Sequence, residues 1–245
     1  NRGIEIVHSA DLPARSGLGS SSTFTVGLLH ALHAFRHEMV TKRELALKAI
    51  NLEQNIIGEA VGSQDQTAAA FGGLNLIEFN KQRTFEVRGL TVHEERSKSL
   101  QDHLLLCFTG FSRTAEVIAK EQIEATDSNG DQLSLMVDIL EEAKSVMFSQ
   151  STPIEEFGRL LNEQWLLKKS LTKKISNPLI DDIYEAGMSA GAIGGKLLGA
   201  GGGGFMLFFA KPEFHRKIRN NLKEKLFVPF RFENTGSQII YFSHD

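Results

Sequence analysis

The chain has 245 residues, of which 41% are hydrophobic and 23% charged, and a net charge of −3. This length and apolar content are enough for one large domain or two lobes with buried cores. The slightly acidic balance argues against nucleic acid as a partner, which would need a basic face. The single cysteine, Cys107, rules out a disulfide within the chain. No run is long and apolar enough to cross a membrane, so we expect no membrane partner and a reducing, cytoplasmic setting.

The first elements surround a segment rich in glycine and serine. Residues 3–11 alternate weakly and predict a strand, and the apolar run 23–35 predicts a helix. A capping-box sequence at 41–44 predicts the start of a second helix that runs to about Ala60. Residues 74–79 and 84–90 then predict two paired strands joined by a polar turn.

The second half of the chain predicts a mixture of helices and strands. A charged stretch with few apolar residues, near 90–103, predicts a boundary between two lobes. The elements expected after it are a buried strand at 104–109, helices at 112–125, 132–148, 152–170 and 178–188, a strand at 205–210, a helix after Pro212, and strands near Phe227 and Ile239. We expect the last two of the four helices to start at Pro153 and Pro178, because proline favours the first helical position. The pattern indicates a mixed fold of the α+β class.

The most informative segment is Asp11–Ser22, DLPARSGLGSSS, directly before the first helix. Backbone N–H groups at a helix start are unpaired, and the helix dipole adds positive charge there, so an anion such as phosphate is favoured. The serine hydroxyls are further ligands for phosphate or Mg²⁺, and one of them is expected to cap the helix. The alternative is an ordinary capped helix after a flexible loop. The candidate nucleotide-binding residues are Arg15, Ser16, Gly17, Leu18, Gly19, Ser20, Ser21 and Ser22.

Two other segments resemble nucleotide-binding motifs, but each lacks a feature that the motif requires. Gly199, Gly201 and Gly204 have the spacing of a dinucleotide fingerprint, but they precede a strand instead of opening a helix. Gly195-Lys196 is followed by leucine, whereas a P-loop requires serine or threonine there.

Three segments together resemble one kinase family. The segment at 13–22 resembles the P-x-x-x-G-L-G-S-S-A signature of the GHMP kinases, with Ser22 where alanine is commoner. Residues 62–73 resemble the catalytic-aspartate segment of that family, and 194–205 resemble its glycine-rich C-terminal motif. The resemblance implies ATP and Mg²⁺ as cofactors and a two-lobe fold, with an N-terminal lobe at 1–95 and a ferredoxin-like α/β C-terminal lobe at 96–245. GHMP kinases carry a further N-terminal stretch, so we expect early strands of the first lobe to be left out of this sequence.

The resemblance assigns the chemistry to a few side chains. Asp65 is implied as the catalytic group that takes or orients the proton of the acceptor hydroxyl; its alternative role is to cap the helix that follows. Ser21 and Glu53 are implied as Mg²⁺ ligands, with Glu59 as a second choice. The alternative for Glu53 is an exposed helix charge.

The acceptor site is implied from the second and third motifs. Its expected residues are Gln64, Arg113, Gly199, Ala200, Gly201 and Gly202. Arg113 ends a T-G-x-x-R segment like that of family members that act on heptose phosphates, and it is either a phosphate partner or a surface ion-pair residue. Lys196 is either a phosphate ligand or a solvated lysine.

Within the family, the segments 62–66, 109–113 and 162–178 look most like those of bacterial D-glycero-α-D-manno-heptose 7-phosphate kinases. The resemblance therefore implies phosphorylation of the anomeric hydroxyl of a sugar phosphate, to a 1,7-bisphosphate used for surface glycans. Fucokinase- or galactokinase-like activity is the alternative. A non-catalytic module that binds nucleotide or sugar phosphate, and a homodimer, stay open.

Overall fold

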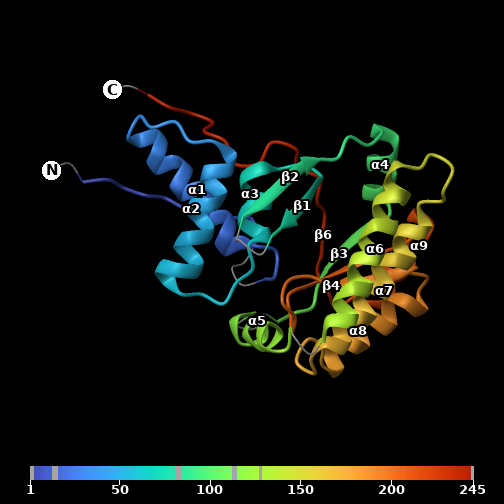
Figure 1. Cartoon of the computed structure of the whole chain (residues 1–245). Coiled ribbons are helices and arrows are strands. Elements are labelled where there is room, and N and C mark those ends of the chain that lie inside the picture. Colours follow the sequence, from blue (N-terminus) through green and yellow to red (C-terminus); the bar gives the residue numbers. More distant parts are fainter. Residues whose placement is uncertain (1–2, 13–15, 81–83, 112–114, 127–128, 244–245) are drawn as a thin grey trace.

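The fold is that of a computed structural model, which describes residues 3–12, 16–80, 84–111, 115–126 and 129–243 (Figure 1). The first part of the chain forms three α-helices, one π-helical turn and a hairpin. Their bounds are α1 Ser20–Phe35, α2 Lys42–Asn51, η1 Leu52–Ile57, α3 Gln64–Phe71, β1 Asn75–Phe79 and β2 Phe85–Gly89. The second part contains α4 Glu94–Asp102, β3 Leu104–Phe108, α5 Ala115–Glu124, α6 Gly130–Phe148, α7 Glu155–Leu171, α8 Pro178–Ser189, β4 Gly194–Leu197, β5 Phe205–Phe209, α9 Pro212–Asn221 and β6 Phe227–Val228.

The first lobe packs its helices against each other and against the hairpin. β1 and β2 pair antiparallel, with Ile77 opposite Val87. The core of this lobe consists of Val26, Leu45, Ala46, Ala49, Ala70 and Phe85. Small residues on α2 and α3 let these helices approach closely. As a result, α3 is held beside the start of α1.

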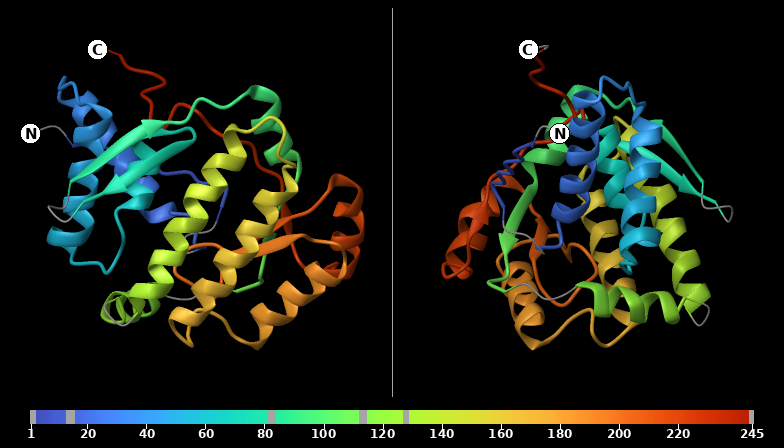
Figure 2. Two further views of the ribbon diagram at one scale, coloured as in Figure 1. Left: turned by 45° about the vertical axis from the view of Figure 1, so that its right-hand side comes forward. Right: turned by 90° about the vertical axis from the view of Figure 1, so that its left-hand side faces the viewer.

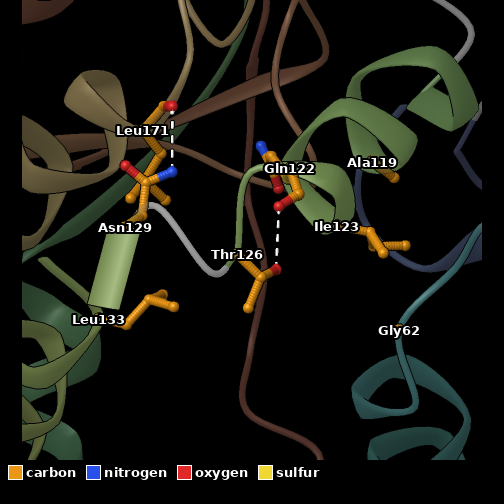
Figure 3. A pocket seen from close by; sticks show the side chains of 8 residues that line it. All are labelled: Gly62, Ala119, Gln122, Ile123, Thr126, Asn129, Leu133 and Leu171. Atoms are coloured by element: carbon orange, nitrogen blue, oxygen red, sulfur yellow. Dashed lines mark hydrogen bonds between the residues drawn. The ribbon is translucent and has the colours of Figure 1, made fainter. Parts of the chain in front are cut away.

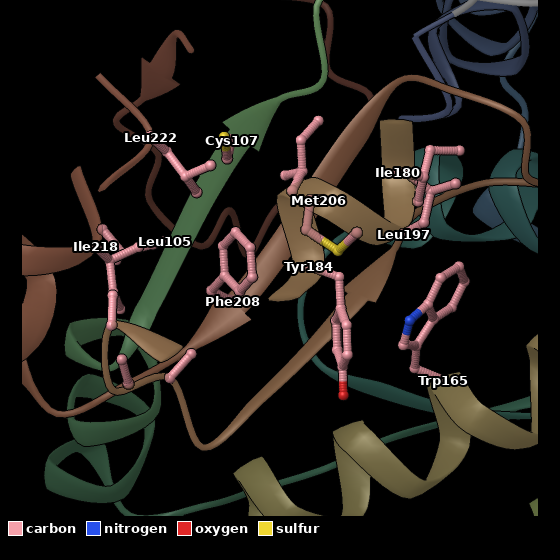
Figure 4. Close-up of a cluster of buried hydrophobic side chains, with 14 of the residues drawn as sticks. Leu105, Cys107, Trp165, Ile180, Tyr184, Leu197, Met206, Phe208, Ile218 and Leu222 are labelled. Carbon is pink, nitrogen blue, oxygen red and sulfur yellow. The ribbon is translucent and has the colours of Figure 1, made fainter. Parts of the chain in front are cut away.

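The second lobe is built on a four-stranded antiparallel sheet of order β4-β5-β3-β6. Its largest core cluster includes Trp165 of α7 and Phe208 of β5, and the fully buried Cys107 fills space within it (Figure 4). Helix α7 lies tightly on β4, because a Cβ placed on Gly194 would come within 2.1 Å of the carbonyl oxygen of Gly158. This fixed contact determines where the C-terminal end of α7 meets the loop after β4.

The tail beyond β6 returns to the first lobe (Figure 2). The N–H of Gly73 donates to the carbonyl of Glu233 at 2.8 Å, and the N–H of Ser237 donates to Ala69 at 2.9 Å. Lys42 also donates to the carbonyl of Thr235. The tail therefore ties α2 and α3 to the strands of the second lobe.

Several expected elements differ in the structure. Residues 3–11 form no strand, and neither do those around Ile239, because neither segment has a hydrogen-bonded strand partner among the described residues. The second helix does not stay α-helical to Ala60: it becomes π-helical at Leu52 and ends before Gly58, whose φ is +81°. The helix expected from Pro153 begins at Glu155, whereas Pro178 opens α8 as predicted.

Two elements have no counterpart in the sequence prediction. Helix α4 occupies the charged stretch that we expected to be a lobe boundary, and β4 forms at the start of the glycine-rich motif 194–205, where no strand was predicted. Neither has a strong apolar period of its own. None of the helices in the described part of the chain is long and apolar enough to span a bilayer.

Candidate active site

The glycine-rich segment opens directly into α1. The N-cap is Gly19, with φ of +69°, and no side chain caps the helix, so the expectation that one serine does so is wrong. The N–H groups of the first turn, at Ser20–Ser22, therefore have no acceptor within the helix. Together with the positive end of the helix dipole, they form a site that favours an anion.

Asp65 lies against this loop. A Cβ placed on Gly19 would be 3.0 Å from the carboxyl carbon of Asp65, so only glycine leaves room for this carboxyl. Asp65 stands in the first turn of α3, and Ser63 is the N-cap residue, so the capping alternative for Asp65 is wrong. The first two sequence motifs therefore meet in space, with a carboxylate beside the anion site.

Glu53 lies behind Asp65 and is only 1% exposed, so its interpretation as a solvated helix charge is wrong. Its Oε2 accepts a 2.8 Å hydrogen bond from the hydroxyl of Ser22 and another from the side-chain amide of Gln66. Its Oε1 has no partner among the described residues. The residue that reaches Glu53 is Ser22; Ser21 is on the exposed side of α1.

Glu53 reaches this position from the π-helical turn η1. A π-helix shifts the side chains after it relative to a regular α-helix, and such turns are frequent at functional sites. Here the turn directs one carboxylate toward the start of α1 while its neighbours Ile56 and Ile57 stay exposed.

The surroundings of Asp65 change the pKa of its carboxyl group. One side of the residue is open to solvent, but the protein around its carboxyl and then the negative charge of Glu53 raise the pKa of Asp65. A raised pKa makes the carboxylate a better proton acceptor, which is the property a general base needs.

The third motif packs on the first. A Cβ on Gly199 would be 2.7 Å from the Cα of Gly17, and one on Gly204 would be 2.2 Å from the carbonyl oxygen of Ser16. The Ser16 side chain is fully buried under this contact, and its hydroxyl has no partner among the described residues. The two glycine loops are therefore in backbone contact.

Two other segments hold the third motif in place. The N–H and the hydroxyl of Thr109 both donate to the carbonyl of Gly204, each at 2.9 Å. The N–H of Gly202 donates to the carbonyl of Ile175, also at 2.9 Å. Thr109 and Ile175, each from a segment noted in the sequence, thus support the glycine-rich loop.

A cavity of about 300 Å³ separates the Asp65 segment from α5 and α6 (Figure 3). It is lined by Gly62, Ala119, Gln122, Ile123, Thr126, Asn129, Leu133 and Leu171. The side-chain amide of Gln122 donates to the carbonyl of Ala200 at 2.7 Å. The cavity therefore lies beside Gly62 of the second motif, and Gln122 in its wall contacts the third motif.

The structure brings most of the predicted residues together. Gln64 lies exposed at the start of α3, beside Asp65. Arg15 and Arg113 lie outside the described residues. The sequence analysis missed the hydrogen bond of Gln66 to Glu53 and that of Gln122 to the loop. No local pattern signals either contact, because each joins segments that meet only in the folded chain.

Comparison with known proteins agrees with this geometry. Residues 1–73 match the GHMP kinases N-terminal domain, and residues 136–227 match the GHMP kinases C-terminal domain. A D-glycero-alpha-D-manno-heptose 7-phosphate kinase from Campylobacter jejuni is 32% identical over 93% of this chain and 68% of its own length. An L-fucokinase/L-fucose-1-P guanylyltransferase from Bacteroides fragilis is 31% identical over 97% of this chain and 26% of its own.

A solved structure shows the same fold. The crystal structure of a D-glycero-D-manno-heptose 1-phosphate kinase from Bacteroides thetaiotaomicron superposes with a TM-score of 0.71 at 28% identity. The match covers 95% of this chain and 66% of that one. The chain thus spans about two thirds of the heptose kinases it resembles, and a much smaller share of the fucokinase.

Proposed function

The chain belongs to the GHMP kinases, a family of ATP-dependent phosphotransferases, and we propose that it phosphorylates the anomeric hydroxyl of a sugar phosphate. The substrate we propose is D-glycero-D-manno-heptose 7-phosphate, converted in the cytoplasm to the 1,7-bisphosphate for surface-glycan synthesis. The observation that carries the proposal is the carboxyl of Asp65 beside Gly19 at the anion-binding start of α1. The heptose kinases among the relatives support the choice of sugar.

Phosphoryl transfer requires mainly that two oxygens be held in line and that charge on the moving group be neutralised. The N–H groups at Ser20–Ser22 bind the phosphates of ATP. Asp65 orients the acceptor hydroxyl and takes its proton as the bond to phosphorus forms. Its raised pKa suits this role.

The residues present fit a magnesium ion. The unpaired Oε1 of Glu53 is a buried anionic acceptor without a proton donor among the described residues, and the hydroxyls of Ser21 and Ser22 lie at the same helix start. Mg²⁺ needs only one or two protein carboxylates besides phosphate oxygens and water. Glu53 would hold the ion together with one of these serines. When bound, Mg²⁺ neutralises the charge that develops on the transferring phosphoryl group.

The cavity beside Gly62 supports a small polar acceptor. Its volume, about 300 Å³, is at the lower end of ligand pockets. Gln122 of α5, with Thr126 and Asn129 between α5 and α6, lines it together with aliphatic side chains. Such a lining suits a sugar, which presents hydroxyls at its edge and C–H groups on its faces.

The fucokinase relative favours a second candidate, an L-fucose 1-kinase. Both candidates transfer phosphate to an anomeric hydroxyl, so they share the catalytic assignment and differ in the acceptor only.

The test is ADP release from the purified protein with Mg²⁺-ATP and, in parallel, heptose 7-phosphate, fucose, galactose or mevalonate. We expect turnover with the heptose phosphate and a loss of about 10²–10⁴-fold in kcat for Asp65→Asn, without loss of nucleotide binding. The matched control is Asp102→Asn, which changes an exposed aspartate at the end of α4. Turnover with fucose alone would replace the heptose assignment, and turnover that survives in Asp65→Asn would refute the role of Asp65.

A further inference from the structure

Two lysines meet at the C-terminal end of α7, next to the third motif. Lys168 of α7 donates from its ammonium group to the carbonyl of Gly199. Lys196 of β4 donates to the side-chain oxygen of Gln164, one helical turn before Lys168. Gln164 and Lys168 are four residues apart and so lie on the same face of α7, which places both lysine side chains on one side of the helix, and the charge of Lys196 lowers the pKa of Lys168. We refer to Lys168 and Lys196 as the lysine pair.

The lysine pair has no counter-charge among the described residues. The neighbouring lysines do have one: Lys169 pairs with Asp181 at 2.6 Å, and Lys174 pairs with Glu121 at 2.9 Å. Each ammonium group carries three donors, and each member of the pair has one partner, a neutral oxygen. Burial and the neighbouring charge lower the pKa of Lys168 to about 7, and burial lowers that of Lys196 to about 8. Two adjacent, partly buried cations without an anion are costly, and a bound anion would remove that cost.

The lysine pair lies beside both parts of the site. Lys168 holds Gly199, the residue that touches Gly17 of the nucleotide loop. Gln122, which lines the cavity, holds the next residue of the loop, Ala200. Leu171, also a cavity residue, follows Lys168 by three positions and so lies on the same face of α7. Lys168 and the cavity residue Gln122 thus hold consecutive residues of the same loop, which connects the lysine pair to the cavity proposed for the acceptor.

We propose that Lys168 and Lys196 bind the phosphate group that the acceptor already carries, and that this contact makes the enzyme prefer a sugar phosphate over a free sugar. The inference rests on the proposed function. The nucleotide's phosphates already have the N–H groups at the start of α1, whereas the acceptor's phosphate still needs a cationic partner. A phosphate would take the remaining donors of both ammonium groups.

The test compares Lys168→Met and Lys196→Met with the control Lys169→Met, which removes the adjacent lysine that has its own carboxylate partner. The Michaelis constants are measured for heptose 7-phosphate, for the same heptose without phosphate, and for ATP. We expect KM for the sugar phosphate to rise about ten- to hundred-fold in the two pair variants, the value for a charged hydrogen-bond partner lost. In Lys196→Met, which has no contact with Gly199 among the described residues, KM for ATP and kcat/KM for the free heptose should change little, and in the control Lys169→Met all constants should change little.

Two outcomes would overturn the proposal. A rise in KM for ATP instead of the acceptor would assign the lysine pair to the nucleotide. Equal losses with the phosphorylated and the free sugar would mean that Lys168 only positions the loop at Gly199. A calorimetric titration with inorganic phosphate, with the nucleotide site saturated by a non-hydrolysable ATP analogue, separates this proposal from the proposed function. Phosphate binding that depends on both lysines would support the pair even if heptose 7-phosphate proved not to be a substrate, and absence of binding would contradict it.

Discussion

The contact between the two glycine loops can be tested by adding a single methyl group. Gly199 has φ of +71°, and a Cβ there would lie 2.7 Å from the Cα of Gly17 and 2.9 Å from its carbonyl oxygen. Both atoms are backbone, so no rotamer change can relieve the overlap. Gly199→Ala must therefore push the third motif away from the nucleotide loop.

The loss of stability expected for Gly199→Ala has two parts, which a second variant can separate. A left-handed conformation costs a residue with a Cβ about 1–2 kcal/mol. An extra methyl group in a tightly packed contact costs a further ~1–3 kcal/mol. Gly58 offers the control, because its φ is +81° but a Cβ there would meet nothing within 4 Å. We expect Gly58→Ala to lower the free energy of unfolding by about 1–2 kcal/mol and Gly199→Ala by roughly 2–5 kcal/mol.

Urea denaturation of the two variants measures the free energies, and titration with an ATP analogue measures nucleotide affinity. Gly199→Ala should bind the analogue more weakly, because Gly17 belongs to the loop that we propose to bind the phosphates. Gly58→Ala should bind it as the unmodified protein does. Equal destabilisation of both variants, with unchanged nucleotide affinity in Gly199→Ala, would refute the reasoning.

Three other predictions follow from the site and its supports. Glu53→Gln removes the negative charge beside Asp65, so the pKa of Asp65 should fall. The acidic limb of the pH profile of kcat/KM should then move to lower pH. A limb that does not move would show that the charge of Glu53 does not raise the pKa of Asp65. The pKa of Asp65 is higher in the folded protein than in the unfolded chain, so between these two pKa values the folded protein binds more protons. The free energy of unfolding therefore falls as the pH rises through the pKa that Asp65 has in the folded protein. Asp65→Asn should therefore be more stable than the unmodified protein at neutral pH but not at acid pH, as denaturation at the two pH values would reveal. Thr109→Val removes a buried hydrogen bond from the hydroxyl to Gly204, so it should lower the free energy of unfolding by about 1–3 kcal/mol and raise KM for the acceptor. Its control, Thr41→Ala, removes the capping box of α2 and should lower the free energy of unfolding by about 1 kcal/mol without changing KM. Equal effects of the two variants on KM would contradict the role of Thr109 in supporting the loop.

The sequence was a good guide wherever the signal was local. The helix signals at Thr41 and Asn177-Pro178 gave helix starts that the structure confirms, because a cap depends on residues three positions apart. The paired strands β1 and β2 and the buried strand β3 were likewise predictable from apolar runs and a polar turn. Strand β4 was not, since its Gly-Gly-Lys-Leu sequence has no strand pattern and is extended only because β5 pairs with it.

The sequence alone predicted an anion-binding helix start, a catalytic-aspartate segment and a glycine-rich motif, because each is written in consecutive residues. The tertiary structure decided how these segments meet. It buried Glu53 against Ser22 through a π-helical turn, capped α1 with glycine instead of serine, and brought Lys168 to the carbonyl of Gly199. The contact of Glu53 with Ser22 and that of Lys168 with Gly199 each join positions 31 residues apart. They therefore depend on the packing of helices and not on a local preference. Charge perturbation and close backbone approach arise only when the chain has folded, because both depend on distances that the sequence does not contain.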